Sequence, residues 1–360
     1  MYDIKNVAQA FFPNESIISV DPLGNGHINS TFLVTTNINK YTMQKINTSI
    51  FKDVDGLMAN VQAVTHHIRD MARQSGIDPT RATLHFMLAP DGNRYLNYEG
   101  DIFRAYIYID NAYSIEKMEN AEDFYQAGIA FGKFANDLSG FDASVLTETI
   151  KNFHNTVSRY NDFEKAVSDN ISGRRDEVQE EIEFVRQRKE FTHMFVDRLN
   201  DGSLPVRVTH NDTKLNNVLF DKDTNLPTTV IDLDTVMPGS YLYDFGDAMR
   251  SGSTHAAEDE KDLSLVDFDL GLYEAFTKGY LSMCKDSLTE TEIELLPYAS
   301  IMLTLECGMR FLGDHLNGDT YFKIHREGHN LDRCRTQFKL VSLMEQNVDN
   351  MKAIIEKYAK

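Results

Sequence analysis

The chain has 360 residues, of which 42% are hydrophobic and 25% are charged. This composition is typical of a globular protein, and the length suits two domains or one bilobal domain. With 36 Lys and Arg against 55 Asp and Glu, the formal net charge is −19. That charge argues against a broad surface for nucleic acid or anionic membranes, which require a positive field. A small anionic ligand is still allowed, because a few cations and a bound metal can reverse the local field.

The cysteines Cys284, Cys307 and Cys334 are far apart, with no Cys-x-x-Cys pair and no Cys/His cluster. This spacing argues against a disulfide framework and against structural zinc. The N-terminal stretch carries Asp3 where a secretion signal would be basic, and no run of about 18 apolar residues follows. We therefore expect a reduced, cytoplasmic protein.

The first 109 residues predict a small lobe rich in β-structure. Hydrophobic spacing predicts helices over 4–12 and 54–74. Alternating residues bounded by turn signals predict strands over 16–22, 30–36, 41–46, 84–88, 94–98 and 103–109. The segment 24–29, between two of these strands, is a partial glycine-rich turn whose backbone N–H groups would approach phosphates. An ordinary hairpin turn is the simpler interpretation of the same residues.

The remaining residues, 110–360, predict a mainly helical lobe. Amphipathic spacing predicts helices over 120–138, 175–199, 259–282, 289–316 and 336–358, with one β-like island at 206–234. Strands and helices do not alternate, which argues against a doubly wound sheet. The predicted fold is α+β and bilobal. It has an N-terminal lobe (1–109) of antiparallel sheet plus helix, and a C-terminal, mainly helical lobe (110–360).

One segment, Val208–Phe220, concentrates residues that carry chemistry. It contains His-x-Asp followed five residues later by Asn, and a hairpin then leads to a strand that ends in an Asp-x-Asp pair. In kinases, one Asp accepts the proton of the attacking hydroxyl, while an Asn and a second Asp hold Mg²⁺. Asp212 is then the base. The predicted metal ligands are Asn217, Asp232 and, at a second ion, Asp234.

Polar loops and a second aspartate motif offer alternatives to this interpretation. Loops between strands are often rich in Asp and Asn because these residues cap and turn, but the order of Asp, Asn and hairpin favours phosphotransfer. Asp244-Phe245-Gly246 spells the metal-binding tripeptide of protein kinases. The strand–hairpin–strand context belongs to Asp232, so we expect Asp244 to brace the loop as a structural carboxylate. No Walker A sequence is present, which argues against a P-loop kinase.

The His-x-Asp-x-x-x-x-Asn and Ile-Asp-x-Asp patterns resemble the aminoglycoside phosphotransferase/choline kinase-like family of small-molecule kinases, which share a bilobal protein-kinase-like fold. Within that family the chain is similar to N-acetylhexosamine 1-kinases. The segments that carry this resemblance are GNGHINSTFLVTT (24–36), INTSIF (46–51), FDASVLTETI (141–150), RVTHNDTKLNN (207–217), IDLDTVMPGS (231–240), YDFGDAMR (243–250), LECGMRF (305–311) and GDTYF (318–322). The resemblance implies ATP- and Mg²⁺-dependent phosphorylation of the anomeric hydroxyl of N-acetylglucosamine or N-acetylgalactosamine. It also implies that the lobe 1–109 binds the nucleotide and that the lobe 110–360 carries the catalytic loop and the substrate pocket.

The resemblance also implies nucleotide contacts, and the chain departs from the family at one of them. The strand position of the usual ATP-binding Lys is Gln44, and the helix over 54–74 has no Glu to pair with a Lys. Phosphate neutralisation is then expected from Mg²⁺, from backbone N–H groups and from Lys214, although a solvated loop lysine explains Lys214 equally well. The expected nucleotide-binding residues are Gly24, Asn25, Gly26, Gln44 and Lys214.

The sugar that accepts the phosphoryl group, called the acceptor below, is expected to contact Asp212 and five further residues, namely His27, Asn29, Arg250, Arg310 and Tyr321. Arg310 lies in an apolar helical segment, where a buried guanidinium needs partners. Either sugar hydroxyls or Glu306, at position i−4, would serve. Tyr321 offers a ring face and a hydroxyl, but equally suits a core position.

Other functions fit the same motif. A kinase of this fold for choline, homoserine, an aminoglycoside or an unacetylated hexose would share the catalytic residues, so only the pocket distinguishes it. The missing Lys–Glu pair favours a nucleotide-binding pseudokinase, and Asp212, Asn217 and Asp232 argue against one. A helical interaction protein would leave the motif accidental. The predicted partners are ATP and an N-acetylhexosamine, with neither nucleic acid nor membrane, and no oligomeric state is predicted.

Overall fold

The computed structural model describes residues 2–24, 29–115 and 120–360. The chain forms two compact units, and each combines segments that are distant in the sequence. Unit 1 is Met1–Ser114, Gly140–Ile150 and Leu219–Pro238, and unit 2 is Ile115–Ser139, Lys151–Val218 and Gly239–Lys360. The predicted α+β class is confirmed, with an antiparallel sheet in the N-terminal part and mostly helices in the C-terminal part.

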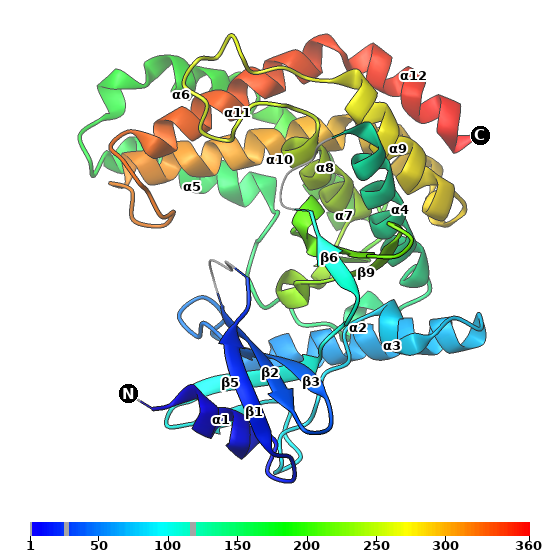
Figure 1. Cartoon of the computed structure of the whole chain (residues 1–360). Helices are drawn as coiled ribbons and strands as arrows, with labels where there is room; N and C mark the ends of the chain where they lie inside the picture. The colour runs from blue at the N-terminus through cyan, green and yellow to red at the C-terminus, as the bar shows by residue number, and fades with distance from the viewer. Residues whose placement is uncertain (1, 25–28, 116–119) are drawn as a thin grey trace. The chain divides into compact units, whose positions relative to one another are not determined.

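Unit 1 is built on a five-stranded antiparallel sheet in the order β1-β2-β3-β5-β4. Figure 1 shows β1, β2, β3 and β5 side by side, with α1 beside β1. A second sheet has the order β6-β8-β9. The elements here are α1 (Ile4–Phe11), β1 (Ile17–Pro22), β2 (Ser30–Thr36), β3 (Lys40–Lys45), α2 (Val54–Gln74), α3 (Pro79–Ala82), β4 (Leu96–Tyr98), β5 (Asp101–Ile107), β6 (Ala112–Ser114), β8 (Val218–Asp221), β9 (Pro227–Val230) and β10 (Met237–Gly239).

The two faces of the larger sheet differ in chemistry, because side chains alternate along each strand. One face carries Val34, Met43 and Phe103, which are fully buried in a hydrophobic cluster with α1. The other face carries polar residues in its middle, where Gln44 on β3 is paired in register with Arg104 on β5. A buried polar pair at this place needs partners.

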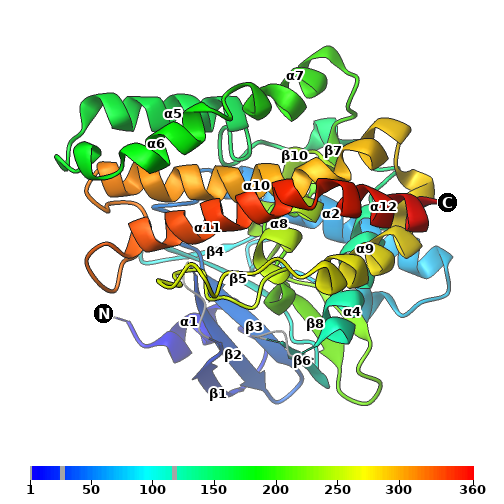
Figure 2. The same ribbon diagram turned by 90° about the horizontal axis from the view of Figure 1, so that it is seen from above.

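Unit 2 is organised around α10 (Glu290–Leu316), which contacts α5, α8, α11 and α12. Figure 2 shows α10 between α5 and α11. A capping box of Thr289 and Glu292 begins the helix. The other elements are α4 (Ala121–Asp137), α5 (Thr156–Asp169), α6 (Gln179–Arg186), α7 (His193–Asp201), β7 (Arg207–Thr209), α8 (Tyr241–Gly252), α9 (Leu270–Cys284), α11 (His329–Gln346) and α12 (Val348–Ala359).

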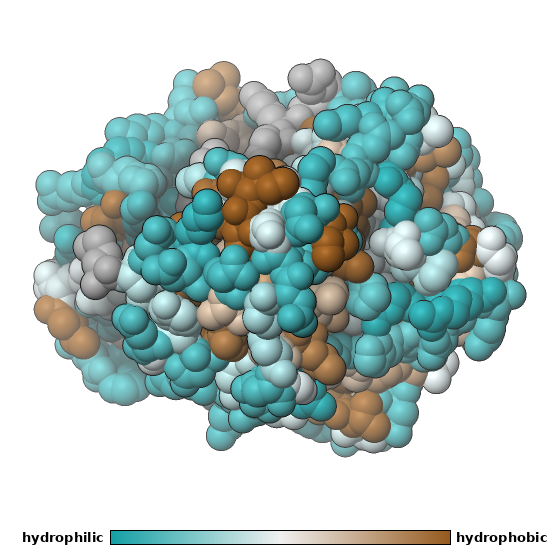
Figure 3. Space-filling model, turned by 60° about the horizontal axis from the view of Figure 1, so that its bottom comes forward, coloured by the Kyte–Doolittle hydropathy of each residue, from teal (hydrophilic) through white to brown (hydrophobic). Residues whose placement is uncertain are grey.

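Among the described residues, α10 alone is long and apolar enough to cross a membrane. However, 83% of its most apolar window is buried inside the protein, which is typical of a core helix. On the face drawn in Figure 3, hydrophilic residues predominate, and hydrophobic side chains lie between them in small groups.

Four sequence predictions of secondary structure were wrong. The predicted helix 336–358 is divided at Asn347 into α11 and α12. The predicted strand 84–88 is reduced to an isolated bridge between Phe86 and Tyr106. The nearby residues 101–103 of β5 pair with β4, so only a short stretch of β5 is left for residues 85–87. The predicted helix 175–199 is broken into α6, α7 and two 3₁₀ turns, and the predicted helix 259–282 begins only at Leu270.

Three glycines bring α4 and α9 into close contact. A Cβ atom at Gly128 would lie 2.4 Å from the carbonyl oxygen of Phe276, and one at Gly132 would lie 2.4 Å from that of Tyr280. From the other side, a Cβ at Gly279 would lie 2.2 Å from the carbonyl oxygen of Tyr125. Because the obstacles are backbone atoms, an added methyl group would force the helices apart.

We expect Gly128→Ala to lower the free energy of unfolding by about 1–3 kcal/mol through this overpacking. Gly313→Ala in α10 is the matched control, because a Cβ at that position would meet no described atom of a neighbouring element within 4 Å. There the alanine should stabilise the helix by about 0.5–1 kcal/mol. Urea unfolding followed by circular dichroism measures both, and equal midpoints for the two variants would contradict the close-contact interpretation.

Candidate active site

The loop His210–Asn217 is held by two carboxylates of α8. Ser240 caps the start of α8, which places Asp244 and Asp247 one turn apart on the same side. Asp244 accepts hydrogen bonds from the backbone N–H groups of His210 (2.8 Å) and Asn211 (2.7 Å). Asp247 accepts one from the N–H of Thr213 (3.1 Å). The expected bracing role of Asp244 is confirmed.

Burial has opposite outcomes for these two carboxylates. Burial raises the pKa of Asp244 to about 6, although His210 and the two backbone N–H groups act to lower it. Burial also acts to raise the pKa of Asp247, but the cations Arg250 and Lys214 outweigh it and the pKa is lowered. Asp247 therefore stays ionised, whereas Asp244 titrates in a range accessible to enzyme assays.

Asp212, the predicted base, has a partner at each carboxylate oxygen. Lys214 Nζ lies 2.6 Å from Oδ1, and Asn217 Nδ2 donates to Oδ2 over 3.0 Å. Asn217 Nδ2 also donates to the main-chain oxygen of Asp212 over 2.9 Å. Burial acts to lower the pKa of Lys214, but Asp212 and Asp247 outweigh it and the pKa is raised. Unit 2 thus brings Asp212, Lys214 and Asn217 together, with a cation at the carboxylate.

The donor set suits a hard cation such as Mg²⁺. Because Asn217 uses its amide nitrogen on Asp212, its amide oxygen is turned elsewhere, and no described residue hydrogen-bonds to that oxygen. Asp232, in unit 1, offers a carboxylate at the start of the 3₁₀ turn Leu233–Thr235. Amide and carboxylate oxygens are the ligands that Mg²⁺ prefers, so the residues fit the predicted metal in kind.

Arg250, which was predicted to contact the phosphoryl acceptor, is buried and forms ion pairs with two carboxylates. Its Nε lies 2.9 Å from Asp247 Oδ1, and its Nη1 lies 3.1 Å from Glu258 Oε1. Both contacts lie within unit 2. Arg250 therefore neutralises Asp247, which in turn holds the loop backbone at Thr213.

A cavity of about 240 Å³ lies beside α10 in unit 2, and Arg310 and Tyr321 both line it. The Arg310 guanidinium lies 5.5–5.9 Å from the ring centres of Phe153, Tyr321 and Phe322. Among the residues that the structure describes, it has no hydrogen bond and no ion pair. Glu306 instead pairs with His154, 2.9 Å away, so the alternative of a Glu306–Arg310 pair was wrong. The Arg310 guanidinium, a group of five N–H donors, therefore lines this cavity without a hydrogen-bond partner among the described residues.

Asp314 shapes the loop on one side of the cavity. Its carboxylate accepts hydrogen bonds from three successive backbone N–H groups, those of residues 320–322, at 2.8–2.9 Å. Asn330 Nδ2 adds a fourth, at 2.9 Å. These bonds place the rings of Tyr321 and Phe322 next to Arg310.

The remaining predicted residues lie in unit 1. Gly24 has φ +71, as a turn glycine does, whereas Asn25, Gly26 and His27 lie outside the described residues. Gln44 Nε2 donates to Thr31 Oγ1 over 3.1 Å. Asn29 was predicted to contact the phosphoryl acceptor, and Asp234 to bind metal. In the structure, Asn29 Nδ2 donates a hydrogen bond to Asp234 Oδ2 over 2.6 Å. The sequence prediction missed Arg104, whose guanidinium contacts both Gln44 and Asp234. Only the strand register could have revealed it.

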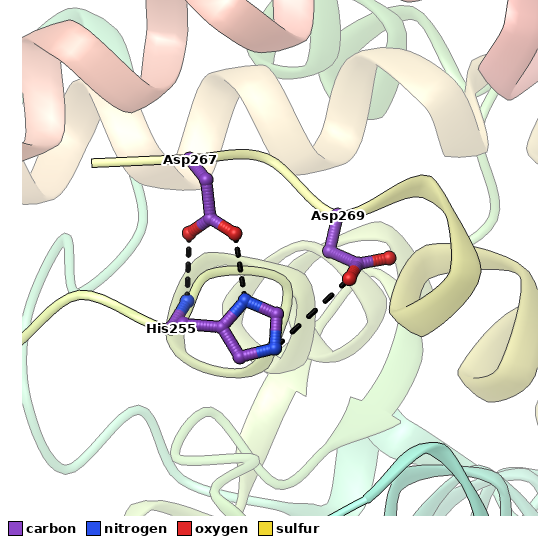
Figure 4. A group of neighbouring side chains, drawn as sticks. All are labelled: His255, Asp267 and Asp269. Carbon is purple, nitrogen blue, oxygen red and sulfur yellow. Dashed lines mark hydrogen bonds and ion pairs between the residues drawn. The ribbon is translucent and has the colours of Figure 1, made fainter. Parts of the chain in front are cut away.

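A second group of side chains, His255, Asp267 and Asp269, is drawn in Figure 4. His255 Nδ1 lies 2.6 Å from Asp267 Oδ2, and Nε2 lies 4.0 Å from Asp269 Oδ2. Asp269 also caps the start of α9. The hydrogen bond to Asp267 raises the pKa of His255. A protonated His255 between two carboxylates explains this group as a structural contact, which joins the two ends of the loop between α8 and α9.

Comparison with known proteins identifies the family of the chain and structures with a similar fold. The chain belongs to the phosphotransferase enzyme family, whose family model matches residues 19–278. Its fold is similar to that of a microcompartment-associated aminopropanol kinase (16% identity, 97% of this chain and 99% of that one, TM-score 0.57). It is also similar to a spectinomycin phosphotransferase solved with ADP and spectinomycin (10% identity, 96% and 99%, TM-score 0.59). A third similar structure is an amicoumacin kinase solved with AMP-PNP and Ca²⁺ (13% identity, 94% and 93%, TM-score 0.57). The chain is therefore a phosphotransferase with the fold of small-molecule kinases.

We expect Asp244→Asn to lower kcat at least about 10-fold, because an amide cannot accept from both N–H groups and a lost bond of this kind is worth about 1.5–3 kcal/mol. In the wild type, protonation of Asp244 as the pH falls below about 6 should remove the same bonds and lower activity. The variant should lack this acid limb. Activity measured from pH 5 to 8 tests this, and an unchanged limb in the variant would assign it to another group.

Stability should follow pH in the opposite direction. Since the folded-state pKa of Asp244 is raised, its stabilisation is fully present below the unfolded pKa and is lost as the pH rises through about 6. The thermal stability of the wild type, measured by its unfolding temperature, should therefore decrease as the pH rises through this range, relative to that of the Asn variant.

Proposed function

We propose that this phosphotransferase is an ATP- and Mg²⁺-dependent kinase that phosphorylates O1 of N-acetylhexosamines. The choice of N-acetylglucosamine or N-acetylgalactosamine, and of the anomeric position, rests on the sequence resemblance. The observation that carries the acceptor class is the Arg310 guanidinium at the cavity in unit 2, which pairs with no described residue. The three free thiols, two of them buried, accord with action in the reducing cytoplasm.

The Arg310 guanidinium in the cavity lining is a donor without a hydrogen-bond partner among the described residues, which favours an acceptor rich in oxygen. The formal charges of the lining balance, since Arg159 and Arg310 face Asp162 and Asp314. Asp314 is used by the loop, however, and the Asp162 side chain is 67% exposed. A guanidinium donates only, so its ligand must accept, as hydroxyl and acyl oxygens do.

The guanidinium of Arg310, unpaired among the described residues, argues against a cationic acceptor such as choline or an aminoglycoside. An ammonium group has donors but no acceptor. At 4 Å, a guanidinium would repel it by about 1–4 kcal/mol, depending on the local dielectric. The aromatic faces that would attract a cation are already beside Arg310.

The size of the cavity also fits one sugar ring. Its volume of about 240 Å³ corresponds to roughly eight waters at about 30 Å³ each. A pyranose with a small acyl substituent is of this size.

The cavity and the catalytic loop are linked through α8 and α10. Arg250, on α8, and Arg310, on α10, both influence the thiol of Cys307, whose pKa burial raises to about 11. Arg250 also influences Lys214, the partner of Asp212.

In the proposed mechanism Asp212 accepts the proton of the O1 hydroxyl while the bond from O1 to the γ-phosphorus forms and the bond to ADP breaks. Asn217 orients the Asp212 carboxylate, and Lys214 offers positive charge for the transferring phosphoryl group. Asn217 and Asp232 would hold Mg²⁺, which supplies charge neutralisation at the phosphates when bound. Positioning and electrostatics should provide most of the acceleration.

An ADP-release assay with N-acetylglucosamine, N-acetylgalactosamine, galactose and choline tests this function. We expect turnover with the two acetylated sugars and little with choline. Asp212→Asn should reduce turnover about 10²- to 10⁴-fold, the usual contribution of a general base, while leaving ATP affinity by calorimetry near that of the wild type. Asp223→Asn, in the exposed hairpin, is the matched control. Preferred turnover of choline would refute the acceptor, and absence of turnover with all four would favour a pseudokinase.

Arg310→Ala should raise KM for the acceptor sugar about 10- to 100-fold, the loss expected for charge-assisted hydrogen bonds. KM for ATP should stay within the error of the wild-type value. Arg335→Ala is the control, because that arginine of α11 pairs with Glu181 and does not line the cavity. Initial-rate kinetics over both substrates separate the two constants, and an unchanged acceptor KM would remove Arg310 from the site.

A further inference from the structure

The polar face of the sheet in unit 1 contains a buried arginine that the family pattern does not lead one to expect. Arg104 on β5 is 2% exposed and lies in register opposite Gln44, the position of the usual ATP-binding Lys. Gln44 Oε1 accepts from Arg104 Nε at 2.9 Å and from Nη2 at 2.8 Å. The cation of this face therefore comes from the neighbouring strand, and Gln44 orients it.

Arg104 forms a buried ion pair with Asp234. Nη2 lies 2.5 Å from Oδ1, and the two side chains are only 3% and 5% exposed. The other oxygen of Asp234 accepts from Asn29 Nδ2 at 2.6 Å. Asn29 is fixed in turn, because its Oδ1 accepts from the N–H of Asn47 at 2.9 Å. Within unit 1, Asp234 Oδ2 thus accepts a hydrogen bond, whereas Oδ1 has the ion pair with Arg104 and no hydrogen bond.

Asp234 belongs to the short turn that carries Asp232. The turn Leu233–Thr235 is a 3₁₀ turn, and Asp232 precedes it in a left-handed conformation with φ 60° and ψ 57°. Helix α2 contacts the turn, and its buried Asn60 donates to the carbonyl oxygen of Val236 at 3.0 Å. A left-handed aspartate persists only where its surroundings hold it.

Building on the proposed function, we propose that Arg104 is a positioning residue for the metal ligand Asp232. Through its ion pair with Asp234, Arg104 holds the turn Leu233–Thr235 and thereby the conformation of Asp232. In unit 1 this pair takes the place of the Lys–Glu pair that the chain lacks.

Arginine suits this role better than lysine would. Its planar fork presents several N–H groups in fixed directions, so one guanidinium serves both the Gln44 amide oxygen and the Asp234 carboxylate. The rest of the Arg104 guanidinium is enclosed, because the centre of the Phe86 ring lies 5.5 Å from its carbon and Met58 Sδ lies 4.0 Å from Nη1. A lysine ammonium at this place would retain the charge and lose the fork.

Asp234 then has a role that differs from the one expected from the sequence. An aspartate whose two oxygens are held by Arg104 and Asn29 acts as an anchor for the turn and not as a ligand for a second ion. The two roles predict different behaviour of Arg104. If Asp234 were a ligand, weakening its ion pair would leave metal binding unchanged or tighten it.

The test measures the affinity of Mn²⁺, a paramagnetic substitute for Mg²⁺, for the ADP complex by electron paramagnetic resonance. Arg104→Lys and Asp234→Asn should each weaken Mn²⁺ binding about 10- to 100-fold, the usual effect of losing a group that orients a metal ligand. The double variant should be no weaker than the weaker single variant, because both changes break one network. Metal-free ADP affinity by calorimetry should stay near the wild-type value. The controls are Arg73→Lys and Asp70→Asn, which alter an exposed pair of α2.

Unchanged or tighter Mn²⁺ binding in Arg104→Lys would overturn the proposal. If that variant does not fold, Gln44→Leu removes the orienting acceptor without leaving an unpaired charge, and unchanged Mn²⁺ affinity there would overturn it equally. No acceptor is present in this assay, so a wrong acceptor sugar leaves the result intact. A wild-type protein that binds no Mn²⁺ with ADP would refute the proposed function before any variant is compared.

Discussion

The arrangement of the active-site loop depends on two carboxylates buried in one turn of α8. The loop His210–Asn217 follows an irregular path, with Asn211 at φ 66°, so its N–H groups need partners other than a regular ladder. Asp244 and Asp247 provide them. Arg250 and Lys214 outweigh the desolvation of Asp247, whereas His210 and the N–H groups offset that of Asp244 only in part. The position of α8 depends in turn on Gly246, because a Cβ there would lie 2.4 Å from the Ala299 carbonyl oxygen of α10.

Each unit uses a buried Arg–Asp pair close to a residue with a proposed chemical role. In unit 2, Arg250 neutralises Asp247 beneath the loop of Asp212. In unit 1, Arg104 pairs with Asp234, two residues after Asp232. Buried ion pairs contribute little net stability, because desolvation opposes the attraction. Their benefit here is geometric, since each guanidinium restricts where a neighbouring carboxylate and its backbone can lie.

Much of the fold could be predicted from local pattern. Helices with strong periodicity, such as α2 and α4, and the hairpin of β2 and β3 came within one or two residues of the predicted bounds. The loop residues Asp212 and Asn217 were found because their spacing is a property of the sequence alone. The failed predictions involve competition between segments: residues 84–88 share an edge of β5 with β4, and the amphipathic stretch 175–199 is interrupted by 3₁₀ turns.

The roles of Arg104, Arg250 and Asn29 could not be predicted, because each depends on partners distant in the chain or on the packing around them. Arg104 meets Gln44 only through the register of β3 and β5, and Asn29 meets Asp234 across 205 residues. A sequence reveals that an arginine is present in an apolar stretch, but not which carboxylate neutralises it. The expectation that Arg250 contacts the phosphoryl acceptor stays a prediction.

The backbone path of residues 320–322 is fixed by the Asp314 carboxylate, which accepts hydrogen bonds from their main-chain N–H groups and not from their side chains. The outward-facing groups of that loop are therefore free to vary while its backbone keeps its course. Selection or protein engineering can therefore substitute the side chains of this loop one at a time, and so change the ligand preference of the cavity without changing the backbone.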